Sequence, residues 1–128
     1  MNKLLWVLQV LLAVAFVAHG VMFLNPPPDI AVQMNASLPR WFQLFLGVAE
    51  VLAGIGLTVP GVTRVQPGLV PAAAVGVVIV VVSATIWHLM RGEYSSAATT
   101  ALLVAISSFV AFMRWRRLPI VPRAAAAA

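Results

Sequence analysis

The chain has 128 residues, of which 62% are hydrophobic and 9% are charged, and its mean hydropathy is +1.04. Soluble domains are roughly 45–50% apolar, so this composition excludes a soluble protein and indicates an integral membrane protein with three or four spans. The net charge of +5 does not indicate a nucleic-acid partner, because most basic residues lie near the termini beside apolar runs, and the lack of cysteine excludes disulfides, thiolate metal sites and thiol catalysis within this chain.

The first apolar segment predicts a membrane-spanning helix over residues 4–24. No residue between Lys3 and Asp29 carries a fixed charge, and a helix over this range is about 31 Å long, enough to cross a hydrocarbon core of about 30 Å. A competing interpretation is a signal peptide with Lys3 as its basic start and Ala18-His19-Gly20 as its cleavage site. The apolar run is longer than a usual signal-peptide core, which favours the span.

Segments rich in proline and glycine separate three further predicted spans. Residues 25–40, NPPPDIAVQMNASLPR, contain three consecutive prolines and are expected to form a loop, the longest connection in the chain. Spans are predicted at about 41–59, 69–90 and 97–113, and Ser95 or Ser96 is expected to cap the last one. Residues 1–117 therefore form one transmembrane domain, followed by a flexible tail over 118–128.

Four antiparallel helices with short loops predict an all-α, integral membrane four-helix bundle with up-down-up-down topology. Cytoplasmic flanks are enriched in Lys and Arg, so the basic residues predict the orientation. Arg40 and Arg91 fall on one side, beside Asp29 and Glu93. The other basic residues fall on the side of the termini: Lys3, Arg64, Arg114, Arg116, Arg117 and Arg123. Both termini are therefore expected in the cytoplasm.

The tryptophans agree with this topology. Trp6 and Trp115 would lie at the inner membrane interface, and Trp41 and Trp87 at the outer one, where aromatic side chains are enriched. The basic cluster RWRR at residues 114–117 is interpreted as a membrane stop that contacts anionic lipid, and not as a nucleic-acid site.

Glu50 is an acidic residue in the middle of a predicted span. Gly47 and Gly54 lie three residues before it and four residues after it, so the three share a helix face, and small residues let membrane helices approach closely. Glu50 is therefore expected to point into the bundle, about 13 Å below Trp41 and near the middle of the hydrocarbon core. A carboxylate at this depth is either protonated or paired.

The candidate partners of Glu50 are His19, His88, Arg40 and Arg91. His19, about 7 Å from the end of the first span, is the easier partner, whereas a contact with His88 would need helix tilt or a bridging water. Two histidines and a carboxylate resemble a non-haem iron or zinc ligand set, but no pair has the short spacing of a recognisable site, so no metal is predicted. Glu50 then either locks the helix register or faces a ligand or proton path.

Small residues recur on the last predicted span. Ala97, Ala101 and Ala105 repeat at four-residue spacing and are expected to pack against another helix, within the bundle or at an oligomer seam. The sequence has no Gly-rich phosphate loop, no nucleophile elbow and no paired carboxylates, so nothing indicates hydrolytic or phosphoryl-transfer chemistry.

Residues 38–93 resemble the DoxX-like family of small four-helix membrane proteins, and the resemblance extends over about residues 10–115. In that family the second helix carries Gly, Glu and Gly before a Pro turn and an Arg, and the third ends in His shortly before a Gly. The matching residues here are Gly47, Glu50, Gly54, Pro60, Arg64, His88 and Gly92. Many relatives also have a Lys near the end of the first helix, where this chain has Phe23, and His19 just upstream is a candidate replacement.

The resemblance implies several activities. Some DoxX-type proteins are membrane subunits of thiosulfate:quinone or other redox assemblies, and others accompany quinone-detoxifying enzymes. More distant relatives are membrane-protein chaperones, and similar bundles include sterol isomerases and sterol-binding receptors.

Two hypotheses follow. In the first, the chain lies in the bacterial inner membrane and holds a small lipophile, such as a quinone, an isoprenoid or a sterol-like compound, in the outer half of the bundle. It then supports redox or proton-transfer chemistry such as isomerisation, with Glu50 and His19 as candidate catalytic residues and residues 25–40 as a lid. Ligand contacts are expected from Glu50, His19, His88, Trp87, Trp41 and Asn25.

In the second hypothesis the chain is a non-enzymatic accessory or assembly protein that binds another membrane protein through its Ala-rich faces. Neither hypothesis requires a metal or a covalent cofactor. The expected partners are membrane lipid, a lipophilic ligand, a redox or other membrane protein, and a second copy of the chain.

Overall fold

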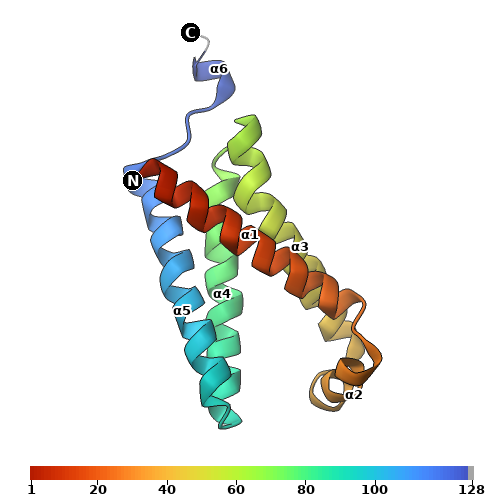
Figure 1. Ribbon diagram of the computed structural model, residues 1–128. Coiled ribbons are helices and arrows are strands. Elements are labelled where there is room, and N and C mark those ends of the chain that lie inside the picture. The colour runs from red at the N-terminus through yellow and green to blue at the C-terminus, as the bar shows by residue number, and fades with distance from the viewer. Residues whose placement is uncertain (127–128) are drawn as a thin grey trace.

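The computed structural model describes residues 1–126, and this part of the chain is helical without any strand (Figure 1). The four long helices are α1 (Asn2–Leu24), α3 (Arg40–Thr63), α4 (Leu69–Met90) and α5 (Tyr94–Phe112), and the π-helical turn η1 (Met113–Arg117) extends α5. Two short helices are α2 (Pro28–Ser37) and α6 (Arg123–Ala126). Each of the four long segments is long and apolar enough to cross a membrane, which confirms the all-α four-helix prediction.

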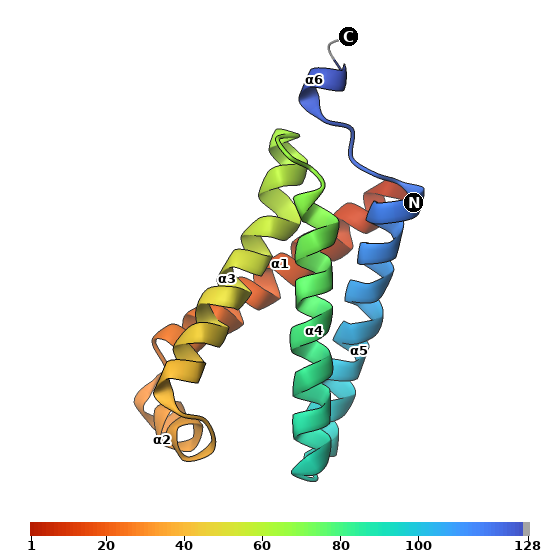
Figure 2. The ribbon, with the colours of Figure 1, turned by 180° about the vertical axis from the view of Figure 1, so that it is seen from behind.

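The long helices form two pairs. α1 packs along α3, α4 packs along α5, and α3 also contacts α4. The two views show α1 crossing the bundle obliquely, and the pairs come closest where the chain begins (Figure 2). We call this the terminal end, since α1 begins, α5 ends and α3 connects to α4 there. The opposite end, which carries α2 and the turn between α4 and α5, is the α2 end.

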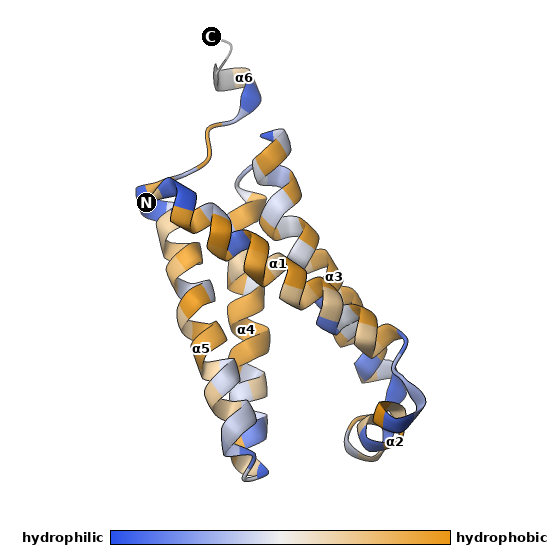
Figure 3. Ribbon diagram, viewed as in Figure 1, coloured by the Kyte–Doolittle hydropathy of each residue, from blue (hydrophilic) through white to orange (hydrophobic). Residues whose placement is uncertain are grey.

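The surface of the bundle suits a hydrocarbon environment. Apolar residues line the four long helices, and hydrophilic residues gather at the two ends and on α2 (Figure 3). Large apolar side chains face outward along the spans, among them Leu11, Val14, Phe45 and Ile79. Because water-facing surfaces rarely carry large continuous apolar areas, the distribution identifies a multi-pass membrane protein.

The bundle interior is apolar at its centre. Buried side chains from all four long helices form one cluster there: Leu5, Leu12, Phe16, Leu57, Val77, Val81 and Val110. The polar side chains buried in the described part of the chain are Gln9, Gln43, Glu50, Ser107 and Arg114, and Gln9 donates to the carbonyl of the core residue Leu57. The site residues therefore lie beside a packed core.

The prediction of a loop over residues 25–40 is wrong, because the helix α2 occupies most of this range. The three prolines do not interrupt this helix. Pro26 and Pro27 precede it, and Pro28 is its first residue, where the missing N–H removes no hydrogen bond. Asp29 in the first turn interacts favourably with the helix dipole. The side-chain amide of Gln43, which is fully buried, donates to Asn35 Oδ1 at 3.0 Å and so ties α2 to α3.

Two helix ends differ from the predicted ones. α3 continues through Pro60 to Thr63 and ends where Arg64 adopts a left-handed conformation, with φ of 57°. Proline removes one backbone hydrogen bond and crowds the preceding turn, but membrane-spanning helices tolerate it, and Pro60 lies only three residues before the end of α3. α5 begins at Tyr94, after Glu93, and no side chain caps it. The prediction of a Ser95 or Ser96 cap is wrong.

The segment after η1 contacts the terminal end. Leu118 packs against the core, and the backbone N–H of Arg123 donates to the carbonyl of Arg64 at 3.1 Å. The flexibility expected for residues 118–128 stays a prediction, and residues 127–128 lie outside the described part of the chain.

Candidate functional site

The structure brings His19 of α1 and Glu50 of α3 together. Nδ1 of His19 lies 2.6 Å from Oε2 of Glu50. At this distance one proton lies between the two atoms, and either partner is the donor, depending on the protonation of the carboxyl group and the imidazole. Glu50 is buried, at 3% exposure, whereas the side chain of His19 is 52% exposed. The pair therefore connects a buried carboxyl group to an accessible imidazole.

Glycines on both helices allow this contact. A Cβ atom on Gly20 would lie 2.7 Å from the carbonyl oxygen of Gly47, and one on Gly54 would lie 2.8 Å from the carbonyl oxygen of Ala13. Real Cβ atoms do not come this close to a backbone oxygen, so α1 and α3 pack backbone to backbone. The predicted role of Gly47 and Gly54 in close approach fits this geometry, and Gly20 is their counterpart on α1.

A pocket of about 240 Å³ lies beside the pair. All four long helices line it, through Ala15, Phe16, His19, Glu50, Val80, Val81, Thr99, Thr100 and Leu103. Its wall is mainly apolar, and its polar groups are the His19–Glu50 pair and two threonine hydroxyls. The hydroxyl of Thr100 is also 2.8 Å from that of Thr85 on α4. The arrangement is typical of ligand pockets, in which a few polar groups are set among apolar side chains.

A second apolar groove, of about 390 Å³, runs between α3 and α4. It shares Phe16, Glu50 and Val80 with the first pocket. Glu50 therefore lies where the two spaces meet, although its side chain is almost fully buried.

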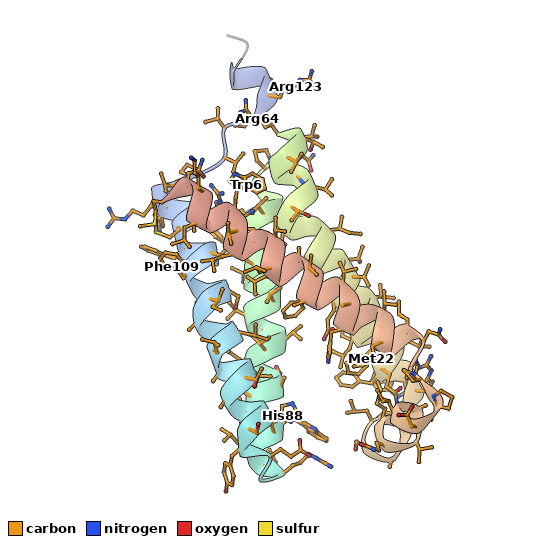
Figure 4. The ribbon with its side chains drawn as sticks, viewed as in Figure 1. Trp6, Met22, Arg64, His88, Phe109 and Arg123 are labelled. Atoms are coloured by element: carbon orange, nitrogen blue, oxygen red, sulfur yellow. The ribbon has the colours of Figure 1, made fainter. Side chains whose placement is uncertain are left out.

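His88 belongs to a different cluster, at the α2 end of α4 (Figure 4). Its Nδ1 lies 2.6 Å from Oε2 of Glu93, and Nε of Arg91 donates to Oε1 of the same carboxylate at 2.8 Å. The Arg91 guanidinium also lies 5.6 Å from the ring centre of Trp87. The Arg91 hydrogen bond, followed by that of His88, lowers the pKa of Glu93 below its ordinary value of 4.5.

Arg40, another candidate partner of Glu50, instead caps α1. Its Nη1 donates to the carbonyl of Phe23 at 2.9 Å, and its Nη2 donates to that of Leu24 at 2.7 Å. These carbonyls at the end of α1 lack partners within the helix, and a cation there interacts favourably with the helix dipole.

Several predicted site residues do not line the 240 Å³ pocket: His88, Trp87, Trp41 and Asn25. Trp41 is exposed and contacts Phe42, and Asn25 ends α1 with its N–H bonded to the carbonyl of Val21. Their role as ligand contacts stays a prediction.

The small residues of α5 divide between two environments. Ala97 is buried, whereas Ala101 and Ala105 are exposed on the outer face of α5. Ala101 and Ala105 therefore do not pack against another helix in the described part of the chain, and they face lipid or another protein.

Sequence reasoning did not predict the burial of four polar residues, Gln9, Gln43, Ser107 and Arg114. Gln9 donates to the carbonyl of Leu57 at 2.7 Å and accepts from Nε of Arg114 at 2.6 Å. An amide inside an apolar span is a detectable signal, because such a group needs a partner in hydrocarbon.

Comparison with known protein families finds a match that covers most of the chain. The model of the DoxX-like family matches residues 7–110, a range that contains both members of the His19–Glu50 pair and parts of all four long helices. No curated protein and no solved structure matches the chain. With most of its length matched, the chain belongs to the DoxX-like family of membrane proteins.

Proposed function

We propose that the chain binds a small lipophile whose polar head group enters the pocket beside His19 and Glu50. One observation carries this proposal: a buried carboxyl group, hydrogen-bonded to histidine, forms part of the wall of an apolar pocket between four spanning helices. An ionisable group inside a membrane domain is costly and is usually functional.

The size of the pocket favours a head group over a whole lipophile. Pockets that enclose drug-sized ligands measure about 300–1,000 Å³, and this one measures about 240 Å³. A single ring, such as that of a quinone, fits such a space, and an isoprenoid tail would lie along the apolar helix surface. The His19–Glu50 pair supplies the polar contact for a ring oxygen, because the Thr99 and Thr100 hydroxyls already donate to carbonyls of their own helix.

The same pair is suited to proton transfer. A head-group oxygen beside Glu50 would exchange a proton with the carboxyl group, and His19 would pass it to the accessible side. Carboxyl groups and histidines are common general acids and bases. In a redox assembly the electrons would come from a partner protein, whereas an isomerisation would need only the proton relay.

The proposed location is the bacterial inner membrane with both termini in the cytoplasm. The charge asymmetry supports this orientation, because basic residues dominate the terminal end. The pocket then lies in the outer half of the membrane.

A second candidate function is that of an accessory protein that binds another membrane protein. The exposed alanines Ala101 and Ala105 favour it, since small residues on an outer helix face allow another helix to approach closely. In this case His19 and Glu50 only fix the contact between α1 and α3.

The test compares small molecules that co-purify with wild type, Glu50→Gln, Glu93→Gln and Ala101→Leu. Each protein is purified in the same mild detergent, checked for fold by circular dichroism, and analysed by mass spectrometry after solvent extraction. Glu93→Gln is the matched control, because it makes the same acid-to-amide change outside the pocket. A short-tailed benzoquinone is then titrated into each protein as a defined probe.

The ligand hypothesis predicts that only Glu50→Gln loses the co-purifying lipophile and weakens quinone binding. A hydrogen bond to a charged group contributes about 1.5–3 kcal/mol, so we expect about a tenfold or larger loss of affinity. Equal ligand content in wild type and a folded Glu50→Gln would refute the hypothesis. Loss of a bound protein partner in Ala101→Leu alone would favour the accessory function.

A further inference from the structure

Arg114 is a buried cation at the terminal end. The residue is 3% exposed, and its guanidinium lies 5.3 Å from the ring centre of Trp6. Nε donates to Gln9 Oε1 at 2.6 Å, and Nη1 donates to Asn2 Oδ1 at 2.8 Å and to the carbonyl of Leu118 at 3.1 Å. All three acceptors are uncharged. Nη2 is buried and has no hydrogen-bond partner among the described residues.

The carboxylates of the chain lie elsewhere. Glu50 contacts His19 inside the bundle, Glu93 contacts His88 at the α2 end, and Asp29 belongs to α2. The described residues thus supply no carboxylate side chain at the terminal end. An unpaired buried charge costs several kcal/mol, so an anion that reached this guanidinium would bind favourably.

A pocket of about 480 Å³ lies directly beside Arg114. Asn2, Trp6 and Arg64 line it, together with residues 118–121. Arg64 comes from the end of α3, and its carbonyl holds the backbone N–H of Arg123 at 3.1 Å. Figure 4 shows Trp6, Arg64 and Arg123 gathered at this end of the bundle. Two arginines therefore line the pocket: Arg114, which is buried in η1, and Arg64, which is exposed directly after α3.

Arg114 also lines a neighbouring apolar groove. It measures about 400 Å³ and is lined by Pro67, Pro71, Trp115 and Ile120 as well as Arg114. Arg114 thus lines both a polar pocket and an apolar groove, at the end of the bundle that carries Trp6 and Trp115. Tryptophans are enriched at membrane interfaces. A phosphate group linked to an acyl chain matches both features, whereas free phosphate would use only the polar pocket.

We propose that this pocket is a discrete binding site for a phosphate group, held by Arg114 and Arg64, and that an anionic phospholipid supplies it. Nε and Nη1 of Arg114 already have partners, so Nη2 is the group left to donate to a phosphate oxygen. The exposed guanidinium of Arg64 supplies a second cation, and arginine donates strong hydrogen bonds to phosphate. The site lies at the opposite end of α1 from His19 and does not depend on the proposed lipophile.

The experiment measures lipid binding to the full-length protein by native mass spectrometry from detergent micelles. The micelles contain equimolar phosphatidylglycerol and phosphatidylcholine with the same acyl chains, and a parallel series contains inorganic phosphate without phospholipid. Arg64→Gln is compared with Arg117→Gln, an exposed arginine at the same end that does not line the pocket. Arg114→Lys is the third variant, since it keeps the positive charge and removes Nη2, the one nitrogen of this guanidinium without a partner.

We expect one phosphatidylglycerol bound in preference to phosphatidylcholine, about tenfold weaker binding in Arg64→Gln, and less than a twofold change in Arg117→Gln. Arg114→Lys should also weaken binding while the protein stays folded. Equal losses in Arg64→Gln and Arg117→Gln would show diffuse charge attraction and overturn the proposal. A lack of preference for phosphatidylglycerol would overturn the assignment to a phospholipid. If inorganic phosphate then raised the unfolding temperature of wild type and not of Arg64→Gln, the site would be assigned to free phosphate. If it raised neither, the proposal would be overturned.

Discussion

Glu50 and Arg114 are both buried. The burial of Glu50 could be predicted from the sequence, and the burial of Arg114 could not. Glycines at helical spacing around Glu50 indicate a face that packs against another helix, and His19 is the nearest basic group by depth. These are local, periodic signals. Arg114 is one of three arginines in a short cluster, and such clusters normally face water. Its side chain is held by Leu118, four residues later, and by Asn2 and Gln9, which come from the other end of the chain.

The first prediction concerns the pKa of the Glu93 carboxyl group. Its pKa is below the ordinary 4.5, first because Arg91 donates a hydrogen bond to it and then because His88 does. A lowered pKa means that the carboxylate stabilises the folded state above pH 4.5 and that this contribution is lost as the pH falls through the lowered value. Arg91→Gln should therefore raise the pKa of Glu93 toward 4.5.

Carbon-13 NMR of glutamate carboxyl groups, titrated in detergent, measures this shift. Arg40→Gln is the control, because Arg40 caps α1 and makes no contact with Glu93. An unchanged titration in Arg91→Gln would show that Arg91 does not hold the carboxylate.

Among the helices, the four long ones were predictable and α2 was not. Apolar runs of spanning length specify helices in hydrocarbon regardless of their neighbours. α2 is short and amphiphilic, and proline suggested a break, although Pro28 only begins the helix. Its position depends on the buried Gln43 amide and on Asn35, a contact that appears only once α3 is in place.

The packing of α1 on α3 leads to a prediction about Gly20. Gly20→Ala places a Cβ atom 2.7 Å from the carbonyl oxygen of Gly47, so the helices must separate. Overpacking of this kind costs about 1–3 kcal/mol. Gly76→Ala on α4 is the matched control, because no atom lies within 4 Å of its added Cβ, and the loss of glycine should stabilise the helix by up to about 1 kcal/mol.

Thermal unfolding of both variants in the same detergent gives the comparison. The expected order of midpoints is Gly76→Ala at or above wild type, and Gly20→Ala below it. If the two variants unfold at the same temperature, the backbone contact between α1 and α3 is not a constraint on the fold.

At the scale of the whole molecule, the helix number was predictable, but the shape was not. Hydropathy alone indicates four crossings, and short connections indicate antiparallel neighbours. The oblique crossing of α1 results from the glycine contacts with α3, which no single helix specifies. The 240 Å³ pocket beside His19 and Glu50 depends on this crossing, because residues of α1 and α5 line it together.

The orientation of this bundle in the membrane is the remaining prediction. The terminal end carries six basic residues and no acidic side chain, whereas the α2 end carries Arg40 and Arg91 together with Asp29 and Glu93. Cytoplasmic flanks are the more basic ones, so the terminal end should face the cytoplasm. The chain has no cysteine, and single cysteines can therefore report each side without a background signal.

Ser95→Cys at the start of α5 and Ala124→Cys beyond η1 are suitable because both residues are exposed and neither change alters the charge. With a membrane-impermeant maleimide on intact bacterial cells, Ser95→Cys should be labelled, and Ala124→Cys should be labelled only after the cells are permeabilised. The reverse pattern would place the His19–Glu50 pocket in the inner half of the membrane and the Arg114 pocket at the outer interface. Since anionic phospholipids are concentrated at the cytoplasmic face of many membranes, the labelling also decides whether the Arg114 pocket faces the leaflet that its proposed ligand favours.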